Sequence, residues 1–468
     1  METTDVEVAQ QAHVADLPKE LGFGDIVLAQ IVYIVTLEFF GTAVKAGSAH
    51  VVLWLLAIVL FFFPQALVVA HLNRLLPVEG GLYEWARHAF GDAIGFLVAW
   101  NIWLYVVLLV AEIGLISTTY LAYAVGPSAS GWAANKVMVV AVSVLVIGGL
   151  AAVSVLGLRV GKWFNNAGGI LTIGIIGLLI VSAFKTRGEF LKFTAPPLSL
   201  FSLSVFSKMT FGALCGFEMV AIFAGESRNP TRNMARSVWL AAPVIALLYI
   251  VGTGAILAFV SPHDVNVIGP IPQALSVAFG SSAVARVVVS IVIMLLLCNS
   301  LSTDNLTFSA SARLPLVAGW DHLLPAWFAR LHQHYKTPIN SILFVGWVTL
   351  AASLAVLVGV GEQEAFSLLQ IWGFTLYGLT YLVMFAIPVL SGRRIGAGLG
   401  LRVAAVSGFV VTLLFVVLSV FPVIEVEDPA LYAWKTIAVI VGMNGLGWLI
   451  YFFSRGASRR ADLRRATS

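Results

Sequence analysis

The stretch FGALCGFEMVAIFAGESRNP, residues Phe211–Pro230, places the carboxylate of Glu218 inside an apolar segment. Three glycines surround this acid: Gly212, Gly216 and Gly225. An ionised side chain in the middle of a bilayer costs a few kcal/mol, so Glu218 is expected to face protein or water rather than lipid. Glycine weakens a helix by about 1 kcal/mol relative to alanine and lets a ligand approach the backbone. The stretch therefore predicts a membrane helix that is interrupted beside a buried polar site.

The composition of the whole chain agrees with a membrane location. Of its 468 residues, 60% are hydrophobic and only 11% are charged, and the mean hydropathy is +0.96. Soluble globular chains are about 45–50% apolar and about 25% charged. Apolar runs such as LWLLAIVLFFFPQALVV lack the alternation over about 10 residues that is typical of β-barrel strands. The composition predicts an all-α membrane protein that crosses the lipid bilayer many times.

Apolar runs of about 20 residues, the length that crosses a bilayer, recur along the chain and predict about twelve spans. The predicted spans are 26–44, 50–72, 93–125, 134–157, 164–184, 204–225, 237–260, 282–312, 339–360, 364–391, 400–421 and 432–454. With a cytoplasmic N-terminus, 19 of the 27 Lys and Arg residues lie inside, five lie outside and three lie at span edges. The positive-inside rule therefore predicts that both termini are cytoplasmic, in the plasma (inner) membrane.

The first predicted span repeats the arrangement of the sixth. Glu38 precedes Gly41 and Thr42 in a segment that is otherwise apolar. Two acids beside glycines, five spans apart, are typical of a five-plus-five inverted repeat with discontinuous helices that bind solute near the bilayer midplane. The predicted units are a tail (1–23), a first five-helix repeat (24–200), a second, inverted repeat (201–391), helices eleven and twelve (392–454) and a basic tail (455–468).

Two further acids lie in predicted spans. Asp304 is expected to face the same pocket from the eighth span. Glu112 is assigned to a structural hydrogen bond between helices, because no residue near it breaks the helix. A pocket with several acids attracts cations. An acid that keeps its own proton would suit a neutral solute equally well, so both kinds of substrate stay open.

Three stretches resemble the amino acid–polyamine–organocation transporter superfamily along the whole membrane region. They are PQALVVAHLNRLLPVEGGLYEWARHAFGDAIGFLVAWNIW (64–103), GFEMVAIFAGESRNPTRNMARSV (216–238) and SARLPLVAGWDHLLPAWFARLHQHYKTPINSI (311–342). The resemblance implies a LeuT-like fold, with two inverted repeats of five helices followed by two more helices. It also implies transport by alternating access, with the substrate held between the unwound parts of spans one and six and against spans three and eight.

The same resemblance implies where the site lies. The break in span one is expected among residues 38–42, and the break in span six between Gly212 and Glu218. The residues expected to bind substrate are Glu38, Phe40, Gly41, Thr42, Phe211, Gly212, Gly216, Phe217, Glu218 and Asp304. The three phenylalanines are candidate aromatic gates, although packing in the core is the commoner fate of such residues.

The chain departs from the family pattern at three points. The Gly-Ser/Ala-Gly segment of span one, whose amides hold a substrate α-carboxylate in the family, is absent, which puts α-amino acid recognition in doubt. Thr172 stands where proton-coupled relatives carry a lysine in span five. Ser302 and Thr303 offer hydroxyls of the kind that line the sodium site of sodium-coupled relatives. The driving ion therefore stays open between a proton and sodium.

Other classes of function lack their motifs. The chain has no GxxxxGK[ST] loop for ATP, and it has no HExxH or GxSxG motif of an enzyme. The basic residues lie at span ends, where membrane topology explains them better than nucleic acid does. We therefore expect a secondary active transporter of amino acids or related organic amines, without cofactor or bound metal. A carrier specific for polyamines or cationic amino acids is the narrower alternative, and a nutrient sensor or channel is the alternative from another class.

Overall fold

The computed structural model describes residues 23–76, 81–156, 162–187, 191–218, 230–280, 282–317, 327, 337–392 and 396–466, and the regular elements in these ranges are all helical. The α-helices are α2 (Phe23–Ile34), α3 (Phe39–Val44), α4 (His50–Ala57), α5 (Phe63–Leu75), α6 (Gly81–Phe90), α7 (Asp92–Ala111), α8 (Ile113–Val125), α9 (Lys136–Leu156), α10 (Lys162–Arg187), α11 (Leu200–Leu214), α12 (Pro230–Leu257), α13 (Pro270–Phe279), α14 (Ala283–Val317), α15 (Ile339–Ala355), α16 (Glu362–Leu390), α17 (Leu399–Leu418) and α18 (Pro429–Ala466).

Each of the twelve predicted spans coincides with one helix or with consecutive helices. Eight helical segments of the described chain are long and apolar enough to cross a membrane, and three shorter apolar helices belong to spans five, six and nine. Span one consists of α2 and α3, and span three consists of α7 and α8. The prediction of an all-α fold with about twelve membrane helices is confirmed. The last helix, α18, continues through residues 455–466, so the predicted basic tail is mostly helical.

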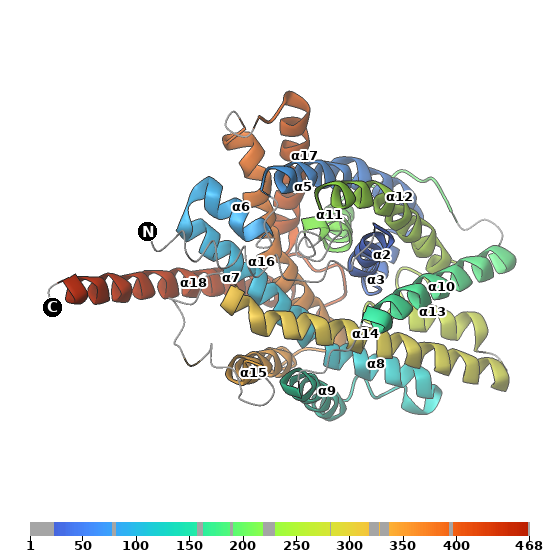
Figure 1. Cartoon of the computed structure of the whole chain (residues 1–468). Coiled ribbons are helices and arrows are strands. Elements are labelled where there is room, and N and C mark those ends of the chain that lie inside the picture. Colours follow the sequence, from blue (N-terminus) through green and yellow to red (C-terminus); the bar gives the residue numbers. More distant parts are fainter. Residues whose placement is uncertain are drawn as a thin grey trace.

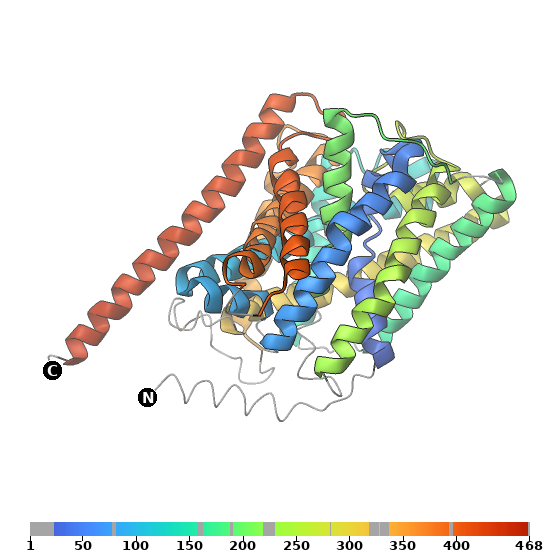
Figure 2. The same ribbon diagram turned by 90° about the horizontal axis from the view of Figure 1, so that it is seen from above.

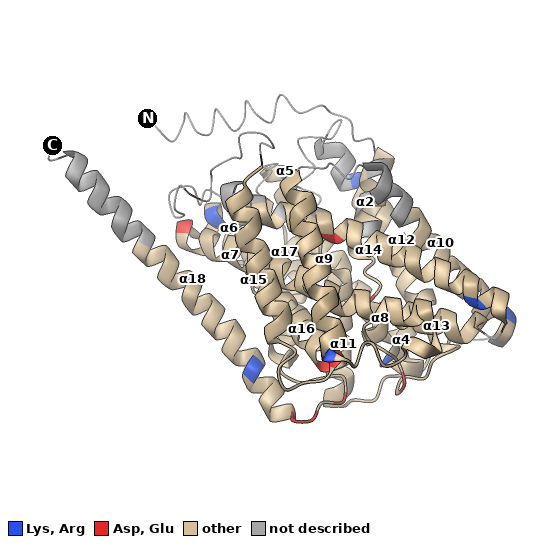
Figure 3. Cartoon of the chain, turned by 90° about the horizontal axis from the view of Figure 1, so that it is seen from below, with Lys and Arg blue, Asp and Glu red and all other residues tan. Residues whose placement is uncertain are grey.

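The first span lies inside the helical bundle. Figure 1 shows α2 and α3 in the interior, with α10, α11, α12, α14 and α16 arranged around them. Figure 2 shows that α2 begins and α18 ends on one face of the molecule, which we call the terminal face. The described charged residues gather mainly toward the two ends of the bundle, and the helix sides between them are almost free of charge (Figure 3). An uncharged band of this kind is the part that lipid surrounds.

The second span contains a π-helical turn at Ile58–Phe62, between α4 and α5. The Phe63 N–H bonds to the Ile58 carbonyl, five residues earlier. Pro64 follows and has no N–H to donate, so the regular hydrogen-bond ladder is already interrupted here. Such turns are frequent at functional sites because they change which side chains face inward. In this span Gln65 is fully buried in the bundle.

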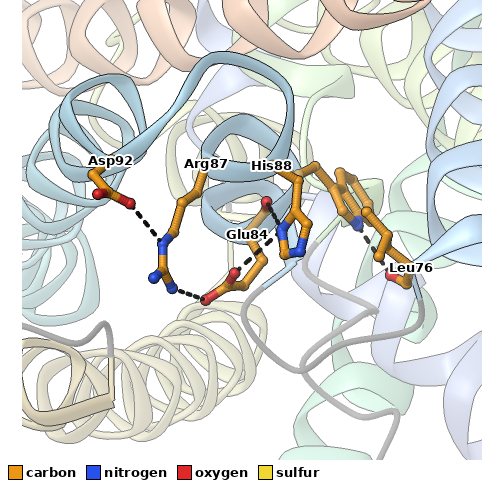
Figure 4. Close-up of polar contacts among 6 residues, drawn as sticks. Leu76, Glu84, Arg87, His88 and Asp92 are labelled. Atoms are coloured by element: carbon orange, nitrogen blue, oxygen red, sulfur yellow. Dashed lines mark hydrogen bonds and ion pairs between the residues drawn. The ribbon is translucent and has the colours of Figure 1, made fainter. Parts of the chain in front are cut away.

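The helix α6 joins spans two and three and was not predicted as a separate element. Its Trp85 indole donates to the Leu76 carbonyl at 3.1 Å, which ties α6 to the end of α5. The Arg87 guanidinium lies 3.5 Å from the Glu84 carboxylate and 3.1 Å from that of Asp92, at the start of α7 (Figure 4). Exposed ion pairs contribute at most about 1 kcal/mol each. The buried indole therefore fixes α6 more firmly than the ion pairs do.

Candidate functional site

The break in span one lies one turn earlier than predicted. The helix α2 ends at Ile34 and α3 begins at Phe39, so residues 35–38 are the interrupted segment, whereas the prediction was 38–42. Gly41 is helical, and a Cβ added to it would lie 2.8 Å from the Val267 Cα. This glycine allows α3 to pack closely against the loop before α13, and it does not break the helix. Thr42 lies in the same short helix and is buried.

A tyrosine from span seven satisfies the polar groups that the break exposes. The Tyr249 hydroxyl donates to the Ile34 carbonyl at 2.9 Å and accepts the Thr36 N–H at 3.0 Å. Its side chain is fully buried, and its ring lies 5.0 Å from that of Phe40. Unpaired backbone groups away from water are costly, so this hydroxyl lets the span stay open at residues 35–38. The sequence analysis missed Tyr249.

Removing this hydroxyl should destabilise the protein. In Tyr249→Phe, the Ile34 carbonyl and the Thr36 N–H lose a partner inside the bundle, which is expected to lower the free energy of unfolding by about 1–3 kcal/mol. Thermal unfolding in detergent measures the effect. An unchanged melting temperature would show that the break does not depend on Tyr249.

The break in span six lies inside the predicted segment. The helix α11 ends at Leu214, Cys215 is extended, and Gly216 has φ +117°, in the region that favours glycine. Gly212 remains helical, and a Cβ added to it would lie 2.0 Å from the Phe39 ring. One glycine thus opens the helix, and the other lets the two interrupted spans touch. Residues 219–229, which continue span six, lie outside the described residues.

Two polar side chains hold the break of span six. The Gly216 N–H donates to the Tyr381 hydroxyl at 2.7 Å, and that hydroxyl donates to the Glu218 carboxylate. With its amide nitrogen facing Leu214, Gln65 donates to the Leu214 carbonyl at 2.8 Å and accepts the Gly216 N–H at 3.2 Å. Glu218 is therefore bound into the break itself. Gln65 and Tyr381 were not predicted as site residues. Their polar side chains inside apolar spans are the signal that could have identified them.

The two breaks lie side by side. A Cβ added to Gly216 would lie 3.1 Å from the Tyr33 ring and 3.5 Å from Ile34, the last residue of α2. Tyr33 is also within electrostatic range of Glu218 and within hydrogen-bonding range of Tyr105. Although these neighbours belong to three central spans, Tyr33 exposes 37% of its surface. The described protein therefore leaves part of the Tyr33 side chain beside the breaks uncovered.

Three acids from spans one, three and eight lie within electrostatic range of one another, and we call them the acid cluster: Glu38, Glu112 and Asp304. The Tyr120 side chain lies within hydrogen-bonding range of Glu38. Glu38 and Glu112 are buried, and Asp304 is partly buried. Among the described residues, no group of three or more His, Cys, Asp or Glu side chains is arranged to hold a metal ion.

The third span is distorted only locally at Glu112. The helix α7 ends at Ala111 and α8 begins at Ile113, but Glu112 between them keeps helical dihedral angles (φ −71°, ψ −21°), and Asp92–Val125 forms one continuous span. No glycine or proline marks this point other than Gly114, whose added Cβ would lie 1.9 Å from the Ser143 hydroxyl of α9. One carboxylate oxygen of Glu112 has no hydrogen-bond partner among the described residues. Such an oxygen is available to a bound ligand.

The three predicted aromatic gates are all packed in the core. Phe40 contacts Tyr249, Phe211 stacks on Phe415 with ring centroids 4.6 Å apart, and Phe217 stacks on Phe62 at 4.7 Å. Each of the three exposes 0% of its surface. The neighbouring Phe39, which was not predicted, lines a cavity instead.

The predicted ion-coupling residues lie near one another on α10 and α14. The Asn299 amide donates to the Thr172 hydroxyl at 3.3 Å, and Thr303 donates to the Asn299 carbonyl at 3.2 Å. The buried Ser302 hydroxyl has no partner among the described residues. Thr303 therefore bonds to its own helix, as such hydroxyls often do, and Ser302 remains available.

Comparison with known proteins places the chain among membrane transporters. It is 26% identical over 381 residues to an uncharacterized transporter of Legionella pneumophila, covering 79% of this chain and 81% of that protein. It is 27% identical to the methylthioribose transporter of Bacillus subtilis, covering 70% and 74%, and 26% identical to a probable agmatine/putrescine antiporter of Lactococcus lactis, covering 48% of each.

A solved structure has the same fold. The crystal structure of MhsT in complex with L-phenylalanine superimposes with a TM-score of 0.59 at 15% sequence identity, covering 86% of this chain and 98% of that one. This likeness supports the LeuT-like arrangement of the helices. The sequence model of the amino acid permease family matches residues 21–453. The chain is therefore a membrane transporter, not an enzyme, and it belongs to the amino acid permease family.

Proposed function

We propose that this protein is a secondary active transporter that moves an amino acid or a related organic amine across the plasma (inner) membrane by alternating access. The observation that carries this proposal is the pair of adjacent interrupted spans beside the acid cluster. Spans one and six meet at Phe39 and Gly212, and their breaks meet again at Tyr33 and Gly216. Broken helices with paired polar groups at the centre of a membrane bundle form a site for a small solute.

The acid cluster favours a solute that carries an ammonium group. The carboxylates of Glu38, Glu112 and Asp304 come from spans one, three and eight, and none of them is in an ion pair with a described Lys or Arg. An ammonium group donates up to three hydrogen bonds and would neutralise part of their charge. The relatives named above are a methylthioribose transporter and a probable agmatine/putrescine antiporter, whose solutes differ widely. The acid cluster therefore favours an amine as the transported solute. Polyamines and cationic amino acids, the solutes of the narrower alternative, also carry such a group.

Close packing on one side of the site supports the proposal of alternating access. Toward the face opposite the terminal face, Phe39 packs edge-to-face on Phe374 of α16, with ring centroids 4.9 Å apart. The cavity that this pair lines has a volume of about 20 Å³, which is room for little more than a water molecule. Tyr33, in the last turn of α2, is only partly covered by protein. Movement of α3 and α11 away from α16 would open the closed side.

The driving ion is part of the same proposal. Glu38, Glu112 and Asp304 could exchange protons with the solute or with water, and Ser302 with Thr172 could hold sodium between α14 and α10. Both termini are assigned to the cytoplasm on the distribution of Lys and Arg. The terminal face is then the cytoplasmic face.

Vesicles containing the purified protein test the proposal. Preloading them with unlabelled solute should drive uptake of the same labelled solute, since counterflow is the signature of a carrier. Lysine, putrescine and phenylalanine are suitable first solutes, each measured with a proton gradient, a sodium gradient or none. An ion current that needs no solute gradient would indicate a channel, and binding without flux would indicate a sensor.

The acid cluster predicts how one substitution changes selectivity. Asp304→Asn removes a negative charge and keeps the size of the side chain, so the transport efficiency for cationic solutes should fall about tenfold more than that for neutral ones. Uptake of lysine and of phenylalanine by the same vesicles measures both. Equal losses for the two solutes would contradict binding of a cation by the cluster.

A further inference from the structure

A buried lysine side chain, Lys208, lines the small cavity beside Phe39. The cavity is lined by residues of α3, α11, α16 and α17 and of the loop after α17, including Thr42, Lys208, Ser367, Gln370 and Val423. The Lys208 side chain comes from α11, one turn before Gly212, and the residue exposes only 3% of its surface. Lys208 is one of the three Lys and Arg residues counted at the edges of the predicted spans, and the sequence pattern predicts no role for it.

Lys208 has a single hydrogen-bond partner among the described residues. Its ammonium donates to the carbonyl of Phe421, in the loop between α17 and α18, and the Ser204 hydroxyl donates to the same carbonyl at 3.2 Å. No described carboxylate forms an ion pair with it, and no charged group lies within its electrostatic range. A lysine ammonium has three donors, so two of them are left toward the cavity.

A buried charge of this kind requires a partner. Charged side chains are rarely buried unless they are paired, because removal from water is costly. The walls of the cavity offer neutral polar groups, from Thr42, Ser367 and Gln370, but no anion. A ligand would supply the missing counter-charge. The cavity has a volume of about 20 Å³, so an anionic group enters it only when the walls move apart.

The N-terminus of α3 is the other place where a carboxylate of the solute could bind, and the carboxylate of Glu38 already lies there. Glu38 is the N-cap residue of α3, and its side chain forms no capping hydrogen bond. The break at Val35–Glu38 contains no glycine that would let a ligand approach the backbone. A solute carboxylate placed there would meet a like charge. One turn along α3, about 6 Å away, Thr42 faces the cavity of Lys208 instead.

We propose that Lys208, with Ser367 and Gln370, forms a subsite for the carboxylate of the transported solute, at the end of the site opposite to the acid cluster. The inference rests on the proposed function and narrows its substrate class. A solute with a side-chain ammonium group at the acid cluster and a carboxylate at Lys208 is a cationic amino acid rather than a polyamine. Phe39 and Phe374 separate the two ends in this closed arrangement and must part when the whole solute enters.

A matched pair of ligands tests the subsite. Lysine and cadaverine differ only by the carboxylate, and the side-chain ammonium of lysine is far enough from its carboxylate to reach the opposite end of the site. The purified full-length protein is expected to bind lysine about tenfold or more tightly than cadaverine, because a charge-assisted hydrogen bond in a dry site has about that effect. In Lys208→Gln, which keeps a donor for the Phe421 carbonyl and loses the charge, the preference should fall below about twofold, with the affinity for the amine unchanged.

Two control variants separate the charge from structural effects. Lys45 is another lysine near the same face, and it donates to the His263 carbonyl at 3.4 Å without lining the cavity, so Lys45→Gln should keep the preference. Ser204→Ala removes the other bond to the Phe421 carbonyl and should keep the preference as well. A preference that survives in Lys208→Gln, or that Ser204→Ala abolishes equally, would overturn the subsite.

A ligand without an amine distinguishes the subsite from the proposed function. Propionate, compared with chloride at equal ionic strength, should raise the melting temperature of the wild type and leave that of Lys208→Gln unchanged. Equal stabilisation by chloride would identify a site for a free inorganic anion and overturn the proposal. If propionate stabilises the protein through Lys208 while no amine or amino acid binds or moves, the subsite stands and the proposed transport of amines fails.

Discussion

Gly212→Ala is expected to abolish transport and to destabilise the fold. A Cβ at this position would lie 2.0 Å from the ring of Phe39, which is itself held against Phe374. A contact under 3 Å forces α3 and α11 apart, and overpacking of a buried contact costs about 1–3 kcal/mol, occasionally more. Because the same contact joins the two interrupted spans, the geometry between them is lost together with stability. Counterflow and thermal unfolding measure the two losses separately.

The chain offers a matched control for this substitution. Gly174 lies in the membrane helix α10, and no atom lies within 4 Å of the position of an added Cβ. Gly174→Ala should preserve transport, and it should leave stability unchanged or raise it by up to about 1 kcal/mol through helix propensity. Normal counterflow in Gly212→Ala would show that the close contact of the two spans is dispensable.

Glu38→Gln is expected to lower the affinity for amine-bearing solutes about 100-fold. The carboxamide keeps the size of the side chain at the N-cap position of α3 but removes one of the three charges of the acid cluster. Loss of one partner of a buried charge pair commonly costs about 2–5 kcal/mol, which corresponds to roughly 30-fold to several thousand-fold in affinity. The dissociation constant of the best solute, measured on the purified protein, reports the effect.

An acid outside the cluster serves as the comparison for Glu38. Glu362 begins α16 and is outside the acid cluster, so Glu362→Gln should leave the affinity within about twofold of the wild type. Wild-type affinity in Glu38→Gln, with the protein folded and at normal yield, would remove Glu38 from the solute site. A loss restricted to amines, with neutral solutes unaffected, would strengthen the case for an ammonium ligand.

Hydropathy was sufficient to predict the membrane architecture. Each predicted span matches a helix or a pair of helices, since burial in lipid demands about 20 apolar residues and internally satisfied hydrogen bonds. The break in span six was also predictable, because Gly216 occupies a φ of +117° that other residues avoid. In both cases the cause is local and can be read from neighbouring residues.

The break in span one depends on residues that are distant in sequence. Residues 35–38 contain no glycine, and they are held open by Tyr249, more than 200 positions later. Gly41 and Gly212 were interpreted as helix breakers, but they are helical residues whose missing side chains make room for Val267 and Phe39. A glycine in a span therefore has two meanings, flexibility or close approach, and only the tertiary neighbours distinguish them.

The surroundings of the aromatic residues and of Lys208 also could not be predicted from their neighbours in the sequence. Phe40, Phe211 and Phe217 flank the breaks in sequence, yet their rings point into the core. Adjacent residues of a short helix point in different directions, so proximity in sequence does not decide which one borders the cavity. Lys208 was overlooked for a related reason, because its importance lies in the lack of a nearby acid, which no single segment reveals.

The hydroxyl of Tyr249 has a consequence for the energetics of solute capture. It keeps the backbone of span one open before any ligand arrives, so the conformational entropy of forming that break is lost during folding and not during binding. A preorganised site of this kind retains more of its interaction energy as affinity. In the proposed transport cycle α3 and α11 then move as rigid bodies, and the backbone at residues 35–38 is expected to keep the same dihedral angles in every state.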